Sequence, residues 1–318
     1  MDKLTAMLTF STVVELASFS RAADALGIPK ARISQRVSDL ENALGVRLLH
    51  RTTRALSLTV DGMAYAERCK QILEDLQELE MRVSGSTSSP KGRLRVETHT
   101  SFGRWVLSSK LIEFRRLYPL IQVRLGAHHQ TRNMIEEGID CAIRGGFIED
   151  SSLIAHRVAI NTAAGLYASP KYLERFNLAN DPTDLDRADL IGWFDPRSNA
   201  PWPWLLCSGA SEFNLKRPPT LLFDDPESAV VAATMGAGIT IALPFAVERL
   251  VRQRQLVPVL PTWQLNLNPV HIVYPASRQF SGRVRAFVDW AIETMKNSAE
   301  LQRSPLDLSM IIDEGRSI

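Results

Sequence analysis

Apolar residues in the first 44 positions recur at the spacing of amphipathic helices. A first helix over residues 4–16 is predicted by Leu4, Met7, Leu8, Val13 and Leu16. A short second helix ends at Gly27, whose missing Cβ suits the left-handed conformation of a helix C-terminus. Pro29 favours the start of a third helix, because its missing N–H costs least in the first turn. The buried stripe of this third helix is predicted to be Ile33, Val37, Leu40 and Leu44.

The face of the third helix opposite this stripe is polar and cationic. Arg can pair with guanine, Gln with adenine, and Ser can contact a base or a phosphate. Two short helices joined by a glycine turn are typical of the helix-turn-helix, which places its second helix in the DNA major groove. Residues 45–59 then alternate apolar and polar positions around a basic tip, which predicts a two-stranded wing beside DNA phosphates. The predicted DNA-binding residues are Ser20, Lys30, Ala31, Arg32, Ser34, Gln35, Arg36, Arg51, Thr52, Thr53 and Arg54.

Residues 60–83 predict one long helix, since their apolar positions follow a 3–4 spacing and their flanks are charged. Thr59 is a suitable N-cap for it. Such a helix either packs on its own domain or joins a second copy of the chain through a coiled-coil-like seam. The Ser- and Gly-rich residues 84–92 that follow predict a flexible hinge and the clearest domain boundary in the sequence.

From residue 94 the pattern changes to short apolar strands that alternate with helices. Strands are predicted over residues 94–97, 121–125, 139–144, 165–168, 239–243 and 270–274, and helices over 104–117, 133–137, 227–235 and 280–295. This alternation indicates an α/β fold with largely parallel strand pairing and helices on both faces of the sheets. Residues 297–318 lose the periodicity, which predicts a loosely held C-terminal tail.

Length and charge set bounds on the class of protein. The 318 residues exceed what one hydrophobic core usually supports, so more than one domain is expected. The net charge of +2 is too small to identify a nucleic-acid-binding protein. Residues 1–60, however, hold eight basic and five acidic side chains, and this local excess of positive charge suits a DNA-binding face.

Cysteine usage and the N-terminus point to a cytoplasmic protein. Cys69, Cys141 and Cys207 lie far apart, so neither a disulfide framework nor a zinc ribbon is indicated, and we expect no metal and no cofactor. The first residues lack the apolar core of a signal peptide. No apolar run reaches the roughly 18 residues that a membrane span requires, so no membrane association is expected.

The N-terminal residues resemble the winged helix-turn-helix of LysR-type transcriptional regulators. The similar segments are residues 17–27 (ASFSRAADALG), 33–54 (ISQRVSDLENALGVRLLHRTTR) and 58–62 (LTVDG). Pro29 departs from the family, because it stands where a Ser cap is usual, and the orphan N–H groups at this helix start are then less well satisfied. Lys30 and Arg32 stand where Gln and Ala are frequent, so the family's target sequences do not carry over to this chain.

Later segments resemble the effector-binding domain of the same family, so that the similarity covers nearly all of residues 3–296. The similar segments are residues 94–96, 101–104, 114–119, 138–144, 168–173 and 236–244. The resemblance implies a DNA-binding domain over residues 1–59, with the helix-turn-helix at 19–38, and a linker helix for dimerisation with its hinge over 60–89. It further implies an effector-binding domain over 90–296, like a periplasmic binding protein, with Rossmann-like subdomains of residues 92–164 plus 268–296 and of residues 165–267. Residues 297–318 are left as the tail.

The resemblance also implies the partners. A regulator of this type binds double-stranded DNA at an inverted repeat as a homodimer or homotetramer and responds to a small-molecule effector. RNA polymerase is a candidate further partner. No enzymatic activity is expected.

An anion site is predicted where the first strand of the α/β part leads into a helix. Free N–H groups and the helix dipole favour an anion at such a junction, and ligands of open α/β sheets gather at the carboxyl ends of the strands. Arg144 closes another strand and offers a guanidinium to a carboxylate. The effector is therefore expected to be an organic anion. The candidate ligand-binding residues are Thr98, Thr100, Ser101, Phe102, Arg144, Phe194, Phe223 and Pro244. Their structural alternatives are helix capping, an ion pair for Arg144 and core packing for the aromatic residues.

Other classes of protein explain less of the sequence. An enzyme could use His128, His129 or Cys141, but adjacent histidines on a strand point to opposite faces, and no catalytic motif occurs in its structural context. A solute-binding protein would explain the α/β part but needs a signal peptide and leaves residues 1–60 without a role. A winged-helix protein–protein module would leave the basic wing unexplained.

Overall fold

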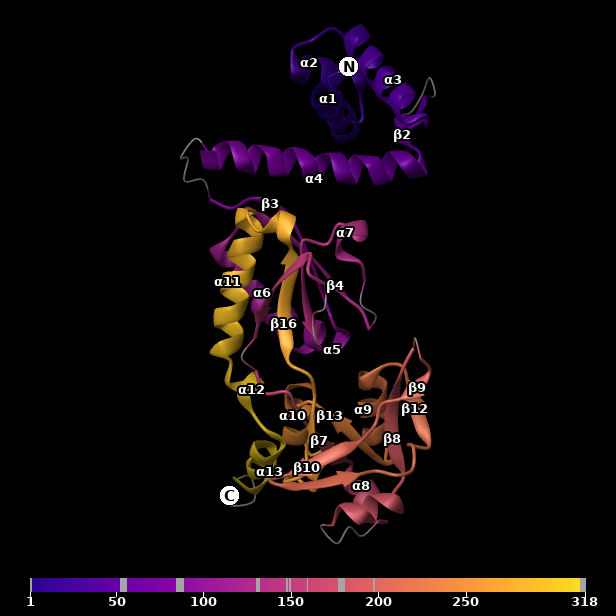
Figure 1. Cartoon of the computed structure of the whole chain (residues 1–318), viewed down its shortest axis with the longest axis vertical. Helices are drawn as coiled ribbons and strands as arrows, with labels where there is room; N and C mark the ends of the chain where they lie inside the picture. Colours follow the sequence, from indigo (N-terminus) through magenta and orange to yellow (C-terminus); the bar gives the residue numbers. More distant parts are fainter. Residues whose placement is uncertain are drawn as a thin grey trace. The chain divides into compact units, whose positions relative to one another are not determined.

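The computed structural model describes residues 2–51, 56–83, 89–129, 132–146, 148, 150–158, 160–176, 181–196 and 198–314. The chain divides into two compact units, Met1–Ser89 and Pro90–Ile318, and each is described by itself. Figure 1 shows the helical N-terminal unit in indigo and purple and the α/β unit in magenta to yellow.

The N-terminal unit is a helical platform with a two-stranded wing. Its elements are α1 (Lys3–Leu16), α2 (Phe19–Leu26), α3 (Lys30–Leu44), β1 (Leu49–Arg51), β2 (Leu56–Leu58) and α4 (Val60–Val83). The two strands pair antiparallel, so the predicted helices and the wing are confirmed. The predicted stripe of α3 is buried at Ile33, Val37 and Leu40, where it meets Phe10 and Val13 of α1.

Local capping explains where these helices begin and end. Ser18 caps α2 by accepting a hydrogen bond from the backbone N–H of Arg21 at 3.2 Å. Gly27 has a φ of 64°, the predicted left-handed value. Pro29 leaves α3 without a side-chain cap, as its substitution for Ser predicted.

The wing is fixed to the helices by two polar side chains and one close backbone approach. Glu41 is only 3% exposed and accepts hydrogen bonds from the N–H groups of Leu48 at 2.9 Å and Leu49 at 3.1 Å. Thr59 accepts from the N–H of Gly62 at 2.9 Å, which confirms it as the N-cap of α4. A Cβ on Gly62 would lie 1.9 Å from the carbonyl oxygen of Leu48, so only glycine allows this approach.

The C-terminal unit holds two sheets, which define a first and a second lobe (Figure 1). The first lobe has the strand order β4-β3-β5-β16-β6, and the second lobe has β12-β8-β13-β7-β14, with β9 beside β8 and β15 beside β7. The strands of the first lobe are β3 (Gly92–Thr98), β4 (Ile121–Ala127), β5 (Cys141–Gly145), β6 (Leu153–Arg157) and β16 (Val270–Pro275). Those of the second lobe are β7 (Ala163–Ala168), β8 (Leu190–Asp195), β9 (Ala200–Pro201), β12 (Leu221–Phe223), β13 (Ile239–Ala242), β14 (Val257–Val259) and β15 (Leu265–Asn266), and a separate hairpin is formed by β10 (Leu205–Ser208) and β11 (Ser211–Asn214).

The prediction of largely parallel pairing is wrong. β3 pairs parallel with β4 and β5, and β8 pairs parallel with β12 and β13. β16 runs antiparallel to both β5 and β6, and β7 runs antiparallel to β13, β14 and β15. The antiparallel pairs lie where the chain passes from one lobe to the other and back, so these strands enter their sheets from the opposite end.

Helices and side chains cover both faces of each sheet, as the sequence predicted. In the first lobe α6 (Ser108–Leu117) and α11 (Gly282–Lys296) cover one face and α7 (Met134–Glu137) the other. In the second lobe α9 (Pro226–Thr234) and α10 (Pro244–Arg252) pack on one face, while α8 (Pro170–Leu173) and η2 (Pro182–Asp186) lie with the hairpin on the other. None of the helices described is both long and apolar enough to cross a membrane.

The helix predicted over residues 104–117 begins earlier and is not uniform. It starts with α5 (Thr100–Phe102), continues as the π-helical turn η1 (Gly103–Leu107), and becomes regular in α6. Single π turns inside helices often mark functional sites.

The prediction of a loosely held C-terminal tail is wrong for residues 299–314. They form α12 (Ala299–Gln302) and α13 (Pro305–Glu314), seen beside α10 and β7 in Figure 1. Leu301 is 1% exposed in the core of the first lobe, and Leu308 is 0% exposed in a core of the second. Leu301 and Leu308 are too far apart to produce a periodic pattern in the sequence. Each is nevertheless buried in a core of one lobe, so the segment packs against both lobes.

Candidate DNA-binding face and effector cavity

The outward face of α3 is formed by residues that the sequence predicted to bind DNA. Lys30, Ala31, Arg32 and Gln35 are exposed, and Ser20 is exposed on α2. Ser34 and Arg36 are half-buried at the flanks of this face. Because the opposite stripe is sealed in the core, the exposed residues have a fixed orientation relative to the platform.

Two of these side chains make contacts within the N-terminal unit. The amide of Gln35 donates to a carboxylate oxygen of Asp39 at 2.7 Å, one helical turn away. The guanidinium of Arg36 donates to the hydroxyl of Thr9 on α1 at 3.5 Å. Arg36 is thus held toward α1, whereas Arg32 lies on the open side of α3.

Only one of the four predicted DNA-binding residues of the wing lies among the described residues. Arg51 ends β1, and the other predicted wing residues, Thr52, Thr53 and Arg54, lie outside the described residues.

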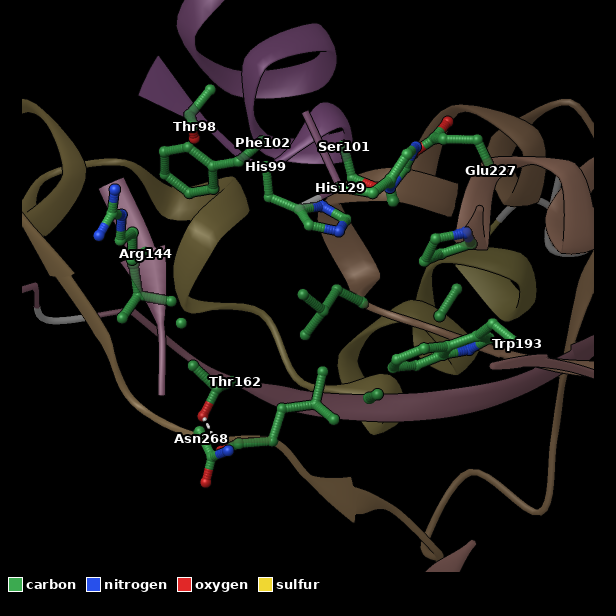
Figure 2. Close-up of a pocket in the computed structure, with 18 of the residues that line it drawn as sticks. Thr98, His99, Ser101, Phe102, His129, Arg144, Thr162, Trp193, Glu227 and Asn268 are labelled. Carbon is green, nitrogen blue, oxygen red and sulfur yellow. Dashed lines mark hydrogen bonds between the residues drawn. The ribbon is translucent and has the colours of Figure 1, made fainter. Parts of the chain in front are cut away.

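A cavity of about 390 Å³ lies between the two lobes of the C-terminal unit and is called the interlobe cavity here. The first lobe contributes the end of β3, the residues that follow β4 and the strand β5, and the second lobe contributes β8, α9 and the end of β13. Its volume lies within the range of sites that enclose a small organic molecule. Figure 2 shows Arg144 and Trp193 on opposite sides of this cavity, with His99 between them.

Five of the eight predicted ligand-binding residues line the interlobe cavity: Thr98, Ser101, Phe102, Arg144 and Phe194. The other three do not. The Thr100 hydroxyl is 3.2 Å from Nε2 of His129. Phe223 packs against the core of the second lobe, and Pro244 is buried at the start of α10, although the next residue, Phe245, does line the cavity.

Arg144 is the most distinctive charged group in the cavity wall. Its guanidinium is half-buried and donates to the backbone carbonyl of Arg132 at 2.6 Å. No carboxylate among the described residues forms an ion pair with it, so the predicted structural alternative is not observed in this part of the chain. Burial lowers the pKa of Arg144, although the nearby charges of Glu97 and Asp150 oppose this shift.

Several residues of the site were not predicted from the sequence. Trp193 and Trp202 line the second-lobe wall with their rings stacked at a centroid distance of 5.0 Å and an angle of 22°. His99 projects into the cavity, where its burial and the neighbouring His129 lower its pKa to about 4, so its ring is neutral near pH 7. The sequence signal was weak, because only the tryptophan-rich residues 201–204 and the position of Trp193 in a strand hinted at an aromatic wall.

Polar contacts join the lobes at one side of the cavity. The indole N–H of Trp105 donates to Glu227 at 2.7 Å, and the guanidinium of Arg104 lies 3.6 Å from the same carboxylate. His129 lies 3.2 Å from Asp225. Arg104 and Trp105 belong to η1, so the π-helical turn supplies the first-lobe half of two of these contacts. The described residues contain no group of three or more His, Cys, Asp or Glu side chains arranged for a metal ion.

Comparison with known proteins assigns a family model to each of the two parts of the chain. Residues 4–63 match the bacterial regulatory helix-turn-helix protein family of the lysR type, and residues 87–296 match the LysR substrate binding domain. The HTH-type transcriptional repressor PA14_22550 of Pseudomonas aeruginosa is 48% identical over 310 residues, which are 98% of each chain.

Solved structures of full-length regulators have the same fold. CrgA, a LysR-type transcriptional regulator from Neisseria meningitidis, matches with a TM-score of 0.59 and 29% identity, over 92% of this chain and 99% of its own. The Vibrio cholerae virulence activator AphB matches with a TM-score of 0.57 and 25% identity, over 92% and 99%. The chain therefore belongs to the LysR family of transcriptional regulators, with an N-terminal helix-turn-helix DNA-binding domain and a C-terminal effector-binding domain.

Proposed function

We propose that this regulator binds an inverted-repeat promoter site as a homodimer, or as a pair of dimers, and that an organic anion in the interlobe cavity changes its affinity for that site. The observation that carries the DNA part is the exposed, cationic and amide-bearing face of α3 on a platform whose opposite side is sealed. The observation that supports the anion is the half-buried guanidinium of Arg144 in the cavity wall, which forms no ion pair with a carboxylate among the described residues.

Dimerisation through α4 is supported by apolar side chains of this helix that its own domain leaves exposed. Tyr65, Ala66 and Cys69 pack into the core of the N-terminal unit, so part of the helix serves its own domain. Val60, Met63 and Ile72 remain 78%, 54% and 47% exposed. Exposed apolar side chains on a long helix with charged flanks suit pairing with a second copy.

The DNA part is tested by substituting one exposed and one half-buried arginine of α3. In fluorescence anisotropy with the fragment upstream of its own gene, Arg32→Ala should lose about 1–3 kcal/mol of binding free energy, because Arg32 is free to reach a base edge. Arg36→Ala tests whether the half-buried arginine also reads bases, as the sequence predicted. Lys171→Ala, which removes one exposed positive charge from the C-terminal unit, is the matched control and should not change the affinity.

The comparison of specific with unrelated DNA decides the role of Arg32. A base-reading role predicts a larger loss on the specific fragment than on unrelated DNA. An equal loss on both, with a flatter salt dependence, would assign Arg32 to the phosphate backbone. Full-length protein that shows no salt-sensitive binding to any genomic fragment would contradict the proposal.

The effector part is tested with a thermal-shift screen of the full chain against organic acids. An acid that raises the melting temperature should also change DNA affinity, typically by 5- to 150-fold for a coupling of about 1–3 kcal/mol. Arg144→Gln should abolish the response to that acid while DNA binding without it remains. A response that survives Arg144→Gln would place the anion elsewhere.

A further inference from the structure

The C-terminal residues 299–311 connect the two lobes again, beside the segments that join their sheets. The chain passes to the second lobe between β6 and β7 and returns to the first between β15 and β16. After α11 it passes to the second lobe once more through α12 and α13, and residues 299–311 are called the strap here. Figure 1 shows α12 between α11 and α13, and α12 contacts both α11 of the first lobe and α10 of the second. The strap therefore spans the joint about which the lobes would move.

The segments that join the sheets are hydrogen-bonded to each other and form a hinge. The backbone N–H of Leu267 donates to the carbonyl of Thr162 at 3.1 Å, and the hydroxyl of Thr162 donates to the carbonyl of Leu267 at 3.0 Å. The strap is bonded directly to this hinge, because the backbone N–H of Asn161 donates to the carbonyl of Leu301 at 2.8 Å. Hinges absorb domain motion through changes of a few backbone angles. A change of these angles at Asn161 would therefore break its bond to the strap.

Buried apolar side chains anchor the strap in both lobes. Leu301 is 1% exposed in the core of the first lobe, and Leu308 is 0% exposed in a core of the second. Pro305 is buried against β7 so closely that a Cβ on Gly165 would lie 2.6 Å from the Cβ of Pro305. The strap is therefore packed into the two cores that lie on either side of the hinge.

Ion pairs accompany both anchors, and the link between them is short. On the side of the first lobe, Glu300 lies 2.9 Å from Lys110 of α6. On the side of the second lobe, Arg303 pairs with Glu248 of α10. Only Arg303 and Ser304 stand between α12 and α13, and such a link reaches roughly 10 Å even when fully extended. The distance between the two anchors can therefore change very little.

We propose that the strap restrains the hinge: it holds the lobes in the arrangement that encloses the interlobe cavity, and a change of the angle between the lobes has to release the strap from the first lobe. The anchor in the first lobe is the weaker one, because it buries Leu301. The second lobe buries both Pro305 and Leu308 and half-buries Ile311. This restraint acts in the protein without any effector, so it does not depend on which molecule the cavity binds.

Lengthening the strap while keeping its anchors separates a restraint on the lobes from simple filling of two cores. Four residues, Gly-Ser-Gly-Ser, are inserted after Gln302 in the full chain, which leaves Leu301 and Leu308 unchanged. The same four residues inserted after Gly209, at the turn between β10 and β11, are the matched control, because this hairpin lies within the second lobe.

The fluorine NMR spectrum of the full chain labelled with 5-fluorotryptophan reports the contact between the lobes. The indole N–H of Trp105 in the first lobe donates to Glu227 of the second at 2.7 Å, so the Trp105 signal depends on the angle between them. Trp204 is 2% exposed in a core of the second lobe and serves as the internal reference. Trp105→Phe and Trp204→Phe identify the two signals.

We expect the insertion after Gln302 to shift or broaden the Trp105 signal and to leave the Trp204 signal unchanged, because the lobes move more freely. Hydrogen exchange of the hinge, measured on peptides that cover residues 158–163 and 266–270, should become about fivefold faster. The insertion after Gly209 should change neither the Trp105 signal nor the exchange of the hinge.

An unchanged Trp105 signal or unchanged hinge exchange in the lengthened strap would overturn the inference and leave the strap as a segment that fills two cores. If the insertion variant does not fold, Leu301→Ala removes the first-lobe anchor and decides by the same two measurements, with Leu306→Ala as its control. Signals of Trp105 and Trp204 that move together would show general loosening of the unit and would also reject the inference. Neither measurement uses DNA or an effector, so a failure here leaves the proposed function standing.

Discussion

The two units carry their functional residues in different ways. In the N-terminal unit the side chains of α3 that we propose to face DNA lie within seven consecutive positions, residues 30–36, on one helix. In the C-terminal unit the cavity wall draws on residues from Glu97 to Val270, and neither lobe encloses it alone. One site is therefore local in the sequence, and the other exists only after two sheets have packed.

This difference decides how each site responds to mutation. A helix face keeps its shape as long as its buried stripe holds the helix on its platform. A single outward substitution should therefore affect only the contact that its own side chain makes. A cavity between lobes depends on every element that fixes the lobes, including elements that never touch the ligand. Substitutions far from the cavity should therefore affect effector binding, whereas distant substitutions should leave DNA contacts of α3 unchanged.

The largest expected effect tests this at the C-terminal helices. Leu308→Ala removes a side chain that is 0% exposed in a core of the second lobe and should lower the free energy of unfolding by about 3 kcal/mol. Leu306→Ala, on the same helix but 40% exposed, is the matched control and should cost well under 1 kcal/mol. All six tryptophans lie in the C-terminal unit, so the denaturant transition of tryptophan fluorescence reports this unit alone.

An unchanged fluorescence transition in Leu308→Ala would mean that α13 is dispensable for the lobe. DNA affinity of the same variant without effector should stay as it was. A parallel loss of DNA binding at temperatures where the protein is folded would break the distinction between the two units.

A smaller effect is expected at the buried carboxylate that holds the wing. Glu41→Ala leaves the N–H groups of Leu48 and Leu49 without their acceptor and should destabilise the N-terminal unit by about 2 kcal/mol. In a denaturant titration, the circular dichroism of the helices should then show a transition at lower denaturant concentration. The transition of tryptophan fluorescence should not move. Glu41→Gln keeps an acceptor oxygen and should therefore lose less stability than Glu41→Ala. Coincident shifts of both signals would show that the units unfold together.

The same contrast explains what the sequence could predict. The helices of the N-terminal unit, the left-handed turn at Gly27 and the cap at Thr59 depend on neighbours a few residues away, and all were predicted correctly. The candidate residues next to strand ends, such as Thr98, Ser101 and Arg144, were also found to line the cavity, because strand ends of an α/β sheet meet at one edge.

Long-range packing accounts for what was missed. Nothing near Leu308 in the sequence indicates the core of the second lobe that it completes, so the tail was predicted to be loose. Phe223 and Pro244 stand beside strand ends in the sequence, yet the sheet turns them into the core. The stack of Trp193 on Trp202 was missed for a different reason: it forms across the antiparallel pair of β8 and β9, and neither strand was predicted.

The smallest expected effect concerns the joint between the wing and α4. The hydroxyl of Thr59 donates to the backbone carbonyl of Arg47 at 2.7 Å and accepts from the N–H of Gly62 at 2.9 Å. Thr59→Ala removes both bonds and should cost about 1 kcal/mol, the usual loss for an N-cap, whereas Thr59→Ser keeps both and should cost only a few tenths. Thermal melting followed by circular dichroism measures this, with tryptophan fluorescence as the internal control. The cap lies at the base of the wing and makes no proposed DNA contact. Thr59→Ala should therefore weaken DNA binding only by lowering the fraction of protein that is folded. A loss of affinity in fully folded protein would instead mean that the cap sets the position of the wing on DNA.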